Sequence, residues 1–230
     1  MEIPPVRKLI LYEDADILVV NKPASLPVLP DGWEPDAPYL VKLLLEKYPE
    51  LQVVHRLDKV TSGVMVFART PEAHRALNMQ FERHSTHKTY HSICVGVPKW
   101  DEHTAKHKLR VNVGHSHRTV VDNGQGKPAE TRFVVLKRLS GGGRGQGFAL
   151  LESIPATGRT HQIRVHAFAL GHPLLGDSLY SAPRTELIDR PALHAQSLTF
   201  IHPTSAEELT FSAPYPLDFK EALENIRAGQ

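Results

Sequence analysis

Short strand-like segments, many of them joined by turns of hairpin length, make up most of this 230-residue chain. They alternate between polar and apolar side chains or are rich in β-branched residues, as strands are. They lie at residues 9–12, 17–21, 88–97, 108–111, 131–139, 148–154, 193–200 and 208–212. Helical patterns run over 39–48, from 70–72 to 82–85, over 159–170 and over 217–227, without regular strand–helix alternation. This order predicts an α+β fold with a mixed, largely antiparallel sheet core and flanking helices.

The middle of the chain is the least patterned part. Residues 98–128 are polar and predict only the short strand near 108–111, with hairpin turns at 114–118 and 122–127. The Gly-rich run at 140–147 predicts a flexible tip between two strands.

Residues 53–70, VVHRLDKVTSGVMVFART, combine a charged turn with strand-like segments on both sides. The turn contains His55, Arg56 and Asp58, and the apolar run 64–68 follows it. Strands on either side can hold such a turn rigidly, so it is a suitable place for site residues. The alternative is a solvated turn with a surface Arg–Asp pair.

Residues 156–166, ATGRTHQIRVH, form a polar turn that leads into a helical pattern. On a helix, Arg159, Gln162 and His166 would project near one another, while Ile163 and Ala167 would face the core together with Phe168 and Leu170. A polar helix start of this kind can accept an anion. The alternative is a capped helix with a solvated basic face.

Composition indicates an ordinary globular protein, with 23% charged and 41% hydrophobic residues. The net charge is +9 over residues 61–184, against −3 over 1–60 and −4 over 185–230, a distribution that suits a polyanionic partner. A single cysteine, Cys94, excludes an intrachain disulfide framework and reads as a buried strand residue. Without a signal peptide or a bilayer-length apolar run, we expect a cytoplasmic protein with no membrane contact, and a monomer.

The histidines do not predict a metal site. His103 and His107, or His115 and His117, have spacings that could bring two rings together, but no acidic or cysteine ligands accompany them. The Gly-rich run lacks the Lys-Ser/Thr of a phosphate-binding loop, and Ser62 does not lie in a nucleophile elbow. The role of the His-rich region 103–118 stays open.

Three separate segments in one order resemble RluA-type pseudouridine synthases: HRLDKVTSGVMVFA, HKTYHSICVG and ATGRTHQIRVHAFALGHPLLGDSLY. The resemblance implies an RNA-acting isomerase that converts specific uridines of tRNA or rRNA to pseudouridine without cofactor or metal. It implies one catalytic domain over residues 1–230, without the separate N-terminal RNA-binding domain that several relatives carry.

The resemblance also implies roles for individual residues. It assigns the catalytic acid to Asp58, a catalytic tyrosine to Tyr90 and a catalytic arginine to Arg164. Arg56 matches the arginine that fills the space of a flipped base. A planar cation suits that task, and an aromatic ring such as that of Tyr90 can stack on uracil.

Further residues of the same segments are expected to contact RNA. They are His55, Arg56, Lys59, Thr61, Ser62, Lys88, Arg159, His161 and Gln162. Gly63 would allow a close approach of the RNA backbone. Two other classes stay open: an RNA-binding module without catalysis, and an enzyme that acts on nucleosides or sugars with the same acid.

Overall fold

The computed structural model describes residues 3–30, 36–114, 117–139 and 147–228. The chain divides by its internal contacts into two compact units. Unit 1 comprises Met1–Lys88 and Ala195–Pro214, and unit 2 comprises Thr89–His194 and Tyr215–Gln230. This division does not test whether the units fold or act separately, so the expected single catalytic domain stays a prediction.

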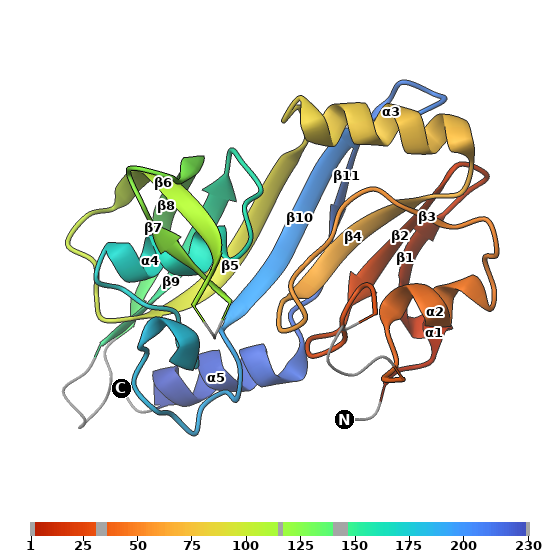
Figure 1. The fold of residues 1–230 in the computed structure, drawn as a ribbon. Coiled ribbons are helices and arrows are strands. Elements are labelled where there is room, and N and C mark those ends of the chain that lie inside the picture. The colour runs from red at the N-terminus through yellow and green to blue at the C-terminus, as the bar shows by residue number, and fades with distance from the viewer. Residues whose placement is uncertain (1–2, 31–35, 115–116, 140–146, 229–230) are drawn as a thin grey trace. The chain divides into compact units, whose positions relative to one another are not determined.

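Unit 1 is built on buried strands near the start of the chain (Figure 1). Its strands are β1 (Ile10–Glu13), β2 (Ile17–Lys22), β3 (Gln52–Val53), β4 (Ser62–Ala68), most of β10 (Leu193–Ile201) and β11 (Glu208–Ser212). The order is β1-β2-β4-β10, with β3 paired to β4 and β11 paired to β10. All seven residues of β4 are buried, and so are five of the six residues of β2. Burial on both faces explains why these strands read as continuous apolar runs.

Helices α1 (Val6–Leu9), α2 (Leu40–Leu45) and α3 (Pro71–Glu82) complete unit 1. Helix α3 begins as predicted, because the Thr70 hydroxyl oxygen accepts a hydrogen bond from Ala73 N at 3.1 Å and Pro71 occupies the first helical position. The helix packs against β3 and β4.

Unit 2 contains a long antiparallel array of strands. They are β5 (His87–Val95, mostly in this unit), β9 (Phe148–Pro155), β8 (Lys127–Leu139), β6 (Glu102–Val113) and β7 (Arg118–Val121), in that spatial order. Neighbouring strands in this order pair antiparallel. The fold class predicted from the sequence is therefore confirmed.

Two helices of unit 2 cover opposite faces of its sheet: α4 (Gln162–Ala169) and α5 (Leu217–Ala228). Ile93 and Leu150 pack in one cluster with α5, whereas their strand neighbours Cys94 and Leu151 pack in another with α4. Alternate residues of a strand point to opposite faces, so the two clusters are the two sides of one sheet. Cys94 is buried as predicted, and burial raises the pKa of its thiol to about 12.

The prediction for residues 98–128 is wrong in extent, because β6 is a twelve-residue strand. Only Ala105 and Leu109 of β6 are buried, so its apolar pattern is too sparse to indicate a strand. Pairing with β8 from Glu102↔Val134 to Leu109↔Lys127 fixes the conformation instead. The hairpin at 114–118 joins β6 to β7, although His115 lies outside the described residues, as do 140–146 of the expected flexible tip.

Helix α4 begins at Gln162, three residues later than predicted. His161 precedes it in the left-handed region, at φ 54°. Arg159 is therefore not on the helix and does not share a helical face with Gln162 and His166. Ile163 and Ala167 face the core as expected, but Phe168 is exposed.

Candidate functional site

The charged turn of residues 54–61 lies between β3 and β4 in unit 1, as the sequence predicts. Strand β3 pairs with β4 through Gln52↔Ala68 and Val53↔Phe67. Within the turn, Thr61 N donates to Asp58 O at 3.0 Å. Leu57 is buried, whereas Asp58 is half-buried and Arg56 and Lys59 are exposed. The turn therefore has an apolar anchor and presents a carboxylate and two cations.

Lys22, at the end of β2, holds the backbone of this turn through hydrogen bonds from its ammonium group. Its side chain is 0% exposed, and Nζ donates to Pro23 O at 2.8 Å, Leu26 O at 2.7 Å and Lys59 O at 3.2 Å. Three carbonyl acceptors match the three N–H groups of an ammonium. Lys22 thus joins the loop after β2 to the residue that follows Asp58.

Lys22 was missed as a site residue because a lysine after an apolar run reads as the end of a strand. One signal was available: Lys22 continues the period-two spacing of Leu18 and Val20, both of which are 0% exposed.

His55 holds the other end of the turn. Its Nε2 accepts a hydrogen bond from Val66 N at 3.1 Å, next to the point where β3 stops pairing with β4. Its ring stacks on Phe81 with centroids 4.4 Å apart. Burial, assisted by the positive charge of Lys88, lowers the pKa of His55 to about 3. A neutral ring that accepts from the backbone supports the turn, and contact with RNA stays a prediction for it.

The residues just after the turn are enclosed. Thr61 and Ser62 are 2% and 1% exposed, so the surface that they were expected to offer to RNA is small. Gly63 has φ 120°, and a Cβ there would lie 2.2 Å from Ala195 O. The close approach that requires glycine is therefore to the backbone of β10. Lys88 is half-buried at the start of β5, and burial lowers the pKa of its amine.

The other predicted catalytic residues lie in unit 2. Tyr90 is half-buried on β5, where it packs against the cluster under α4. Arg164 is buried on α4 and forms a bidentate ion pair, with Nε 2.7 Å from Asp177 Oδ2 and Nη2 2.8 Å from Asp177 Oδ1. Its guanidinium also lies 5.1 Å from the centre of the Tyr180 ring. The catalytic role that the resemblance implies for Arg164, and with it the expectation that a guanidinium keeps the Asp58 carboxylate ionised and oriented, stays a prediction.

Gln162 uses both ends of its amide inside unit 2. Its Oε1 accepts from Thr157 Oγ1 at 2.6 Å and from Arg159 N at 3.1 Å. Its Nε2 donates to Glu130 O at 2.9 Å and to Thr131 Oγ1 at 3.0 Å. With 4% exposure, Gln162 fixes the loop that precedes α4. Its expected contact with RNA stays a prediction.

His161 and Arg159 lie on that loop and are half-buried. His161 Nδ1 is 3.2 Å from the Tyr180 hydroxyl, which fixes the direction of the ring. Unit 2 therefore brings Arg159, His161, Gln162 and Arg164 together on one loop and helix, while Arg56, Asp58 and Lys59 share the turn in unit 1.

One cluster among the described residues has the composition of a metal site: Asp14, Asp16 and His202, whose ligand atoms lie within 4.8 Å of one another. Protein donors already use its oxygens. Asp14 Oδ1 accepts from the backbone N of Asp16 and Ile17, both at 2.8 Å, and Asp14 Oδ2 lies 3.0 Å from His202 Nε2. This network closes the turn between β1 and β2. His103 and His107 lie on strand β6, where four residues span roughly 13 Å, too far for one ion.

None of the helices in the described part of the chain is both long and apolar enough to cross a bilayer.

Several known proteins are similar to this chain in sequence and structure. The family model for RNA pseudouridylate synthase matches residues 16–169. The dual-specificity RNA pseudouridine synthase RluA of Vibrio vulnificus is 40% identical, over 85% of this chain and 78% of that protein. The ribosomal large subunit pseudouridine synthase D of Zymomonas mobilis is 36% identical, over 92% of this chain and 70% of its own. The structure of human RNA pseudouridylate synthase domain containing 1 is similar, with a TM-score of 0.78, 31% identity and coverage of 100% of this chain and 90% of that one.

Proposed function

Because the chain belongs to the RNA pseudouridylate synthase family and is an RNA pseudouridine synthase, we propose that it acts on selected uridines of tRNA or ribosomal RNA through Asp58. The reaction is an isomerisation. The bond from the ribose carbon to the uracil nitrogen breaks, the uracil turns, and the ribose carbon bonds to a ring carbon. That carbon loses its hydrogen as a proton, and the freed ring nitrogen takes up a proton, so the formula is unchanged. No electrons are gained or lost overall.

The observation that carries this proposal is that buried side chains fix the backbone of the turn that contains Asp58. A carboxylate that attacks or removes a proton must be held in one orientation and remain reachable. Asp58 is half-buried on a turn whose backbone is fixed by the buried Lys22 and by the neutral His55. Such a foundation is what a reacting side chain needs.

Base flipping brings the uridine to Asp58. A stacked uridine hides its glycosidic bond, and extruding it costs a few kcal/mol. Arg56 is exposed two residues before Asp58, and its planar guanidinium can fill the vacated stack. Tyr90 offers an aromatic face for uracil, and stacking tolerates rotation of the ring.

We propose that Arg164 stabilises the charged form of the Asp58 carboxylate. Asp177 takes the Nε edge of the guanidinium and fixes its plane, so the arginine is oriented before substrate arrives. A guanidinium facing Asp58 would keep that carboxylate ionised and aligned.

The substrate class is supported by what the relatives are named for. The Zymomonas mobilis protein is named for the large ribosomal subunit and the Vibrio vulnificus protein for dual specificity. We expect this chain to work as a monomer in the cytoplasm, where tRNA and ribosomal RNA are found.

The test uses RNA with tritium on C5 of uridine, because formation of the new carbon–carbon bond releases that hydrogen. We expect wild-type protein to release tritium, and Asp58→Asn to be slower by about 10⁴-fold with unchanged unfolding, since the amide is not a nucleophile. Asp36→Asn makes the same change at an exposed aspartate of unit 1 and should keep full activity.

Activity retained in Asp58→Asn would show that the acid is misassigned. RNA binding without tritium release from the wild type would instead indicate an RNA-binding module.

A further inference from the structure

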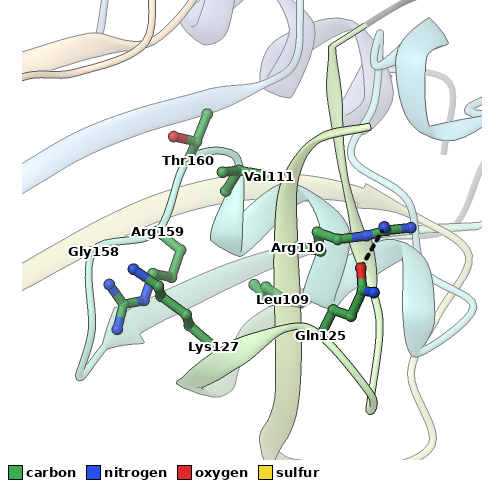
Figure 2. A pocket seen from close by; sticks show the side chains of 8 residues that line it. All are labelled: Leu109, Arg110, Val111, Gln125, Lys127, Gly158, Arg159 and Thr160. Atoms are coloured by element: carbon green, nitrogen blue, oxygen red, sulfur yellow. Dashed lines mark hydrogen bonds between the residues drawn. The ribbon is translucent and has the colours of Figure 1, made fainter. Parts of the chain in front are cut away.

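A cavity of about 310 Å³ lies in unit 2, between the strands β6 and β8 and the loop that precedes α4 (Figure 2). It is lined by Leu109, Arg110, Val111, Gln125, Lys127, Gly158, Arg159 and Thr160. Leu109 packs with Val165 of α4 and gives the cavity an apolar floor. This volume could hold roughly ten water molecules, which is enough for a small charged group and the atoms bonded to it.

The lining contains three cations and no acidic residue. Arg110 is already neutralised, because its Nε lies 2.9 Å from Asp122 Oδ2 and its Nη1 donates to Gln125 at 2.9 Å. For Lys127 and Arg159, the described residues offer no carboxylate within 4.0 Å. Two cations on one cavity repel each other unless an anion lies between them.

Both uncompensated cations are directed to the cavity by the fold. Lys127 pairs with Leu109 across β8 and β6, so the two side chains lie on the same face of the sheet. The Arg159 backbone is fixed by the hydrogen bond that its N donates to Gln162 Oε1. Lys127 and Arg159 both line the cavity (Figure 2).

Arg159 also carries an unused donor. Its Nε is buried and has no hydrogen-bond partner among the described residues. A buried N–H without a partner costs about 1–3 kcal/mol, so a small shift of the side chain that brought Nε to an acceptor would be stabilising. A tetrahedral anion can accept from a guanidinium fork and an ammonium together.

We propose that this cavity binds a phosphodiester of the substrate RNA backbone, through Lys127 and Arg159. The inference rests on the proposed function, which supplies RNA as the polyanion. A backbone phosphate carries no sequence information, so this contact would set the register of the RNA without selecting the uridine.

The test measures binding of fluorescently labelled bulk tRNA over a range of salt concentrations. Lys127→Ala and Arg159→Ala should each weaken binding roughly 10-fold and make the dependence of log affinity on log salt shallower by about 0.7–0.9. The double variant should lose less than the sum, since both side chains contact one phosphate. In turnover, KM should rise while kcat stays unchanged.

Lys137→Ala is the matched control. Lys137 is an exposed lysine of the same strand with no ion pair among the described residues, and it lies roughly 30 Å along the strand from Lys127. It should leave the salt slope unchanged. Arg159→Lys keeps the charge but loses the fork, and should fall between wild type and Arg159→Ala.

Equal salt slopes for Lys127→Ala and Lys137→Ala would overturn the inference. The change in slope would then reflect the loss of one positive charge anywhere on the surface and not a contact in the cavity. Millimolar inorganic phosphate at constant ionic strength should weaken RNA binding only in proteins that retain Lys127 and Arg159, because phosphate and the phosphodiester compete for one cavity. Phosphate binding that requires Lys127 but leaves the RNA affinity unchanged would assign the cavity to free phosphate and overturn the RNA assignment. The two proposals fail separately: wild type without tritium release refutes the enzyme assignment, whereas normal turnover with unchanged slopes refutes only the cavity.

Discussion

The turn between β3 and β4 and the loop before α4 are both polar, yet they are fixed in different ways. In the turn, the fixing groups are Lys22 and His55, while Arg56 and Asp58 are left at or near the surface. In the loop, all the fixing groups belong to the segment that resembles the family, since the Gln162 amide makes internal hydrogen bonds and Arg164 pairs with Asp177. In the turn, by contrast, Lys22 lies outside the segment that resembles the family and His55 lies inside it. Membership of a sequence motif therefore does not by itself mark a residue that touches substrate.

The two regions also compensate a buried cation differently. Three neutral carbonyl oxygens accept from Lys22, whereas a full carboxylate accepts from Arg164. Removing a carbonyl-bound ammonium leaves dipoles unpaired, but removing a carboxylate takes a full negative charge away from a buried cation, which costs more. Variants of the two partners should therefore separate clearly in stability.

The largest effect on stability is expected for Asp177→Ala. It removes the carboxylate that accepts two hydrogen bonds from the buried Arg164 guanidinium, and we expect the free energy of unfolding to fall by about 3–5 kcal/mol in urea titrations. Asp101→Ala is the control, because Asp101 lies 2.7 Å from Arg138 at the surface, the same N···O distance as in the buried pair. The exposed pair should contribute about 0–1 kcal/mol. Equal losses for the two variants would mean that burial does not make the Arg164–Asp177 pair more important for stability than the exposed pair.

Lys22→Met should have an intermediate effect. Methionine fills a similar volume but leaves three carbonyl oxygens without their donor, so we expect a loss of about 2–3 kcal/mol in the free energy of unfolding. Release of Lys59 O loosens the backbone next to Asp58, and tritium release should slow roughly 10- to 100-fold even under conditions where the protein is folded.

Lys42→Met, at an exposed position of α2, controls for the loss of a lysine and should change stability by about 0.5 kcal/mol or less. If Lys22→Met has the free energy of unfolding of the wild type and keeps full activity, Lys22 does not support the turn.

Local features of the fold could be predicted from the sequence, and long-range ones could not. The cap at Thr70, the buried strand at Cys94 and the charged turn before β4 each depend on neighbours within a few residues. The ammonium of Lys22 meets Lys59, 37 residues away, and no spacing rule connects them. Strand β6 depends on pairing with β8 rather than on its own apolar pattern.

The site divides in the same way. Asp58 and Arg164 could be singled out because their segments resemble those of a family, which a single side chain could not have revealed. Asp177 lies in one of the same segments, but its role depends on an ion pair that forms only when the chain after α4 returns to the helix. Gln162 reads as a polar surface residue until its four internal hydrogen bonds are seen.

The smallest effect concerns pH and compares one histidine from each region. Burial lowers the pKa of His166, which is fully buried on α4, to about 4, and that of His55 in the turn to about 3. Both values lie below the ordinary 6.5, so the unfolded chain binds protons more readily. Stability is therefore complete above about pH 6.5 and is lost as pH falls from there toward pH 4 and below.

For His166 alone, the free energy of unfolding should fall by about 1 kcal/mol between pH 7 and pH 5.5. Urea titrations of His166→Gln should show a pH dependence that is shallower by this amount, because glutamine does not titrate, and the remaining slope would contain the part due to His55. His87→Gln removes an exposed histidine that is solvated in both states and should leave the slope as in the wild type. If His166→Gln and wild type lose stability in parallel, His166 is not the group that titrates on unfolding, and the acid sensitivity does not come from α4.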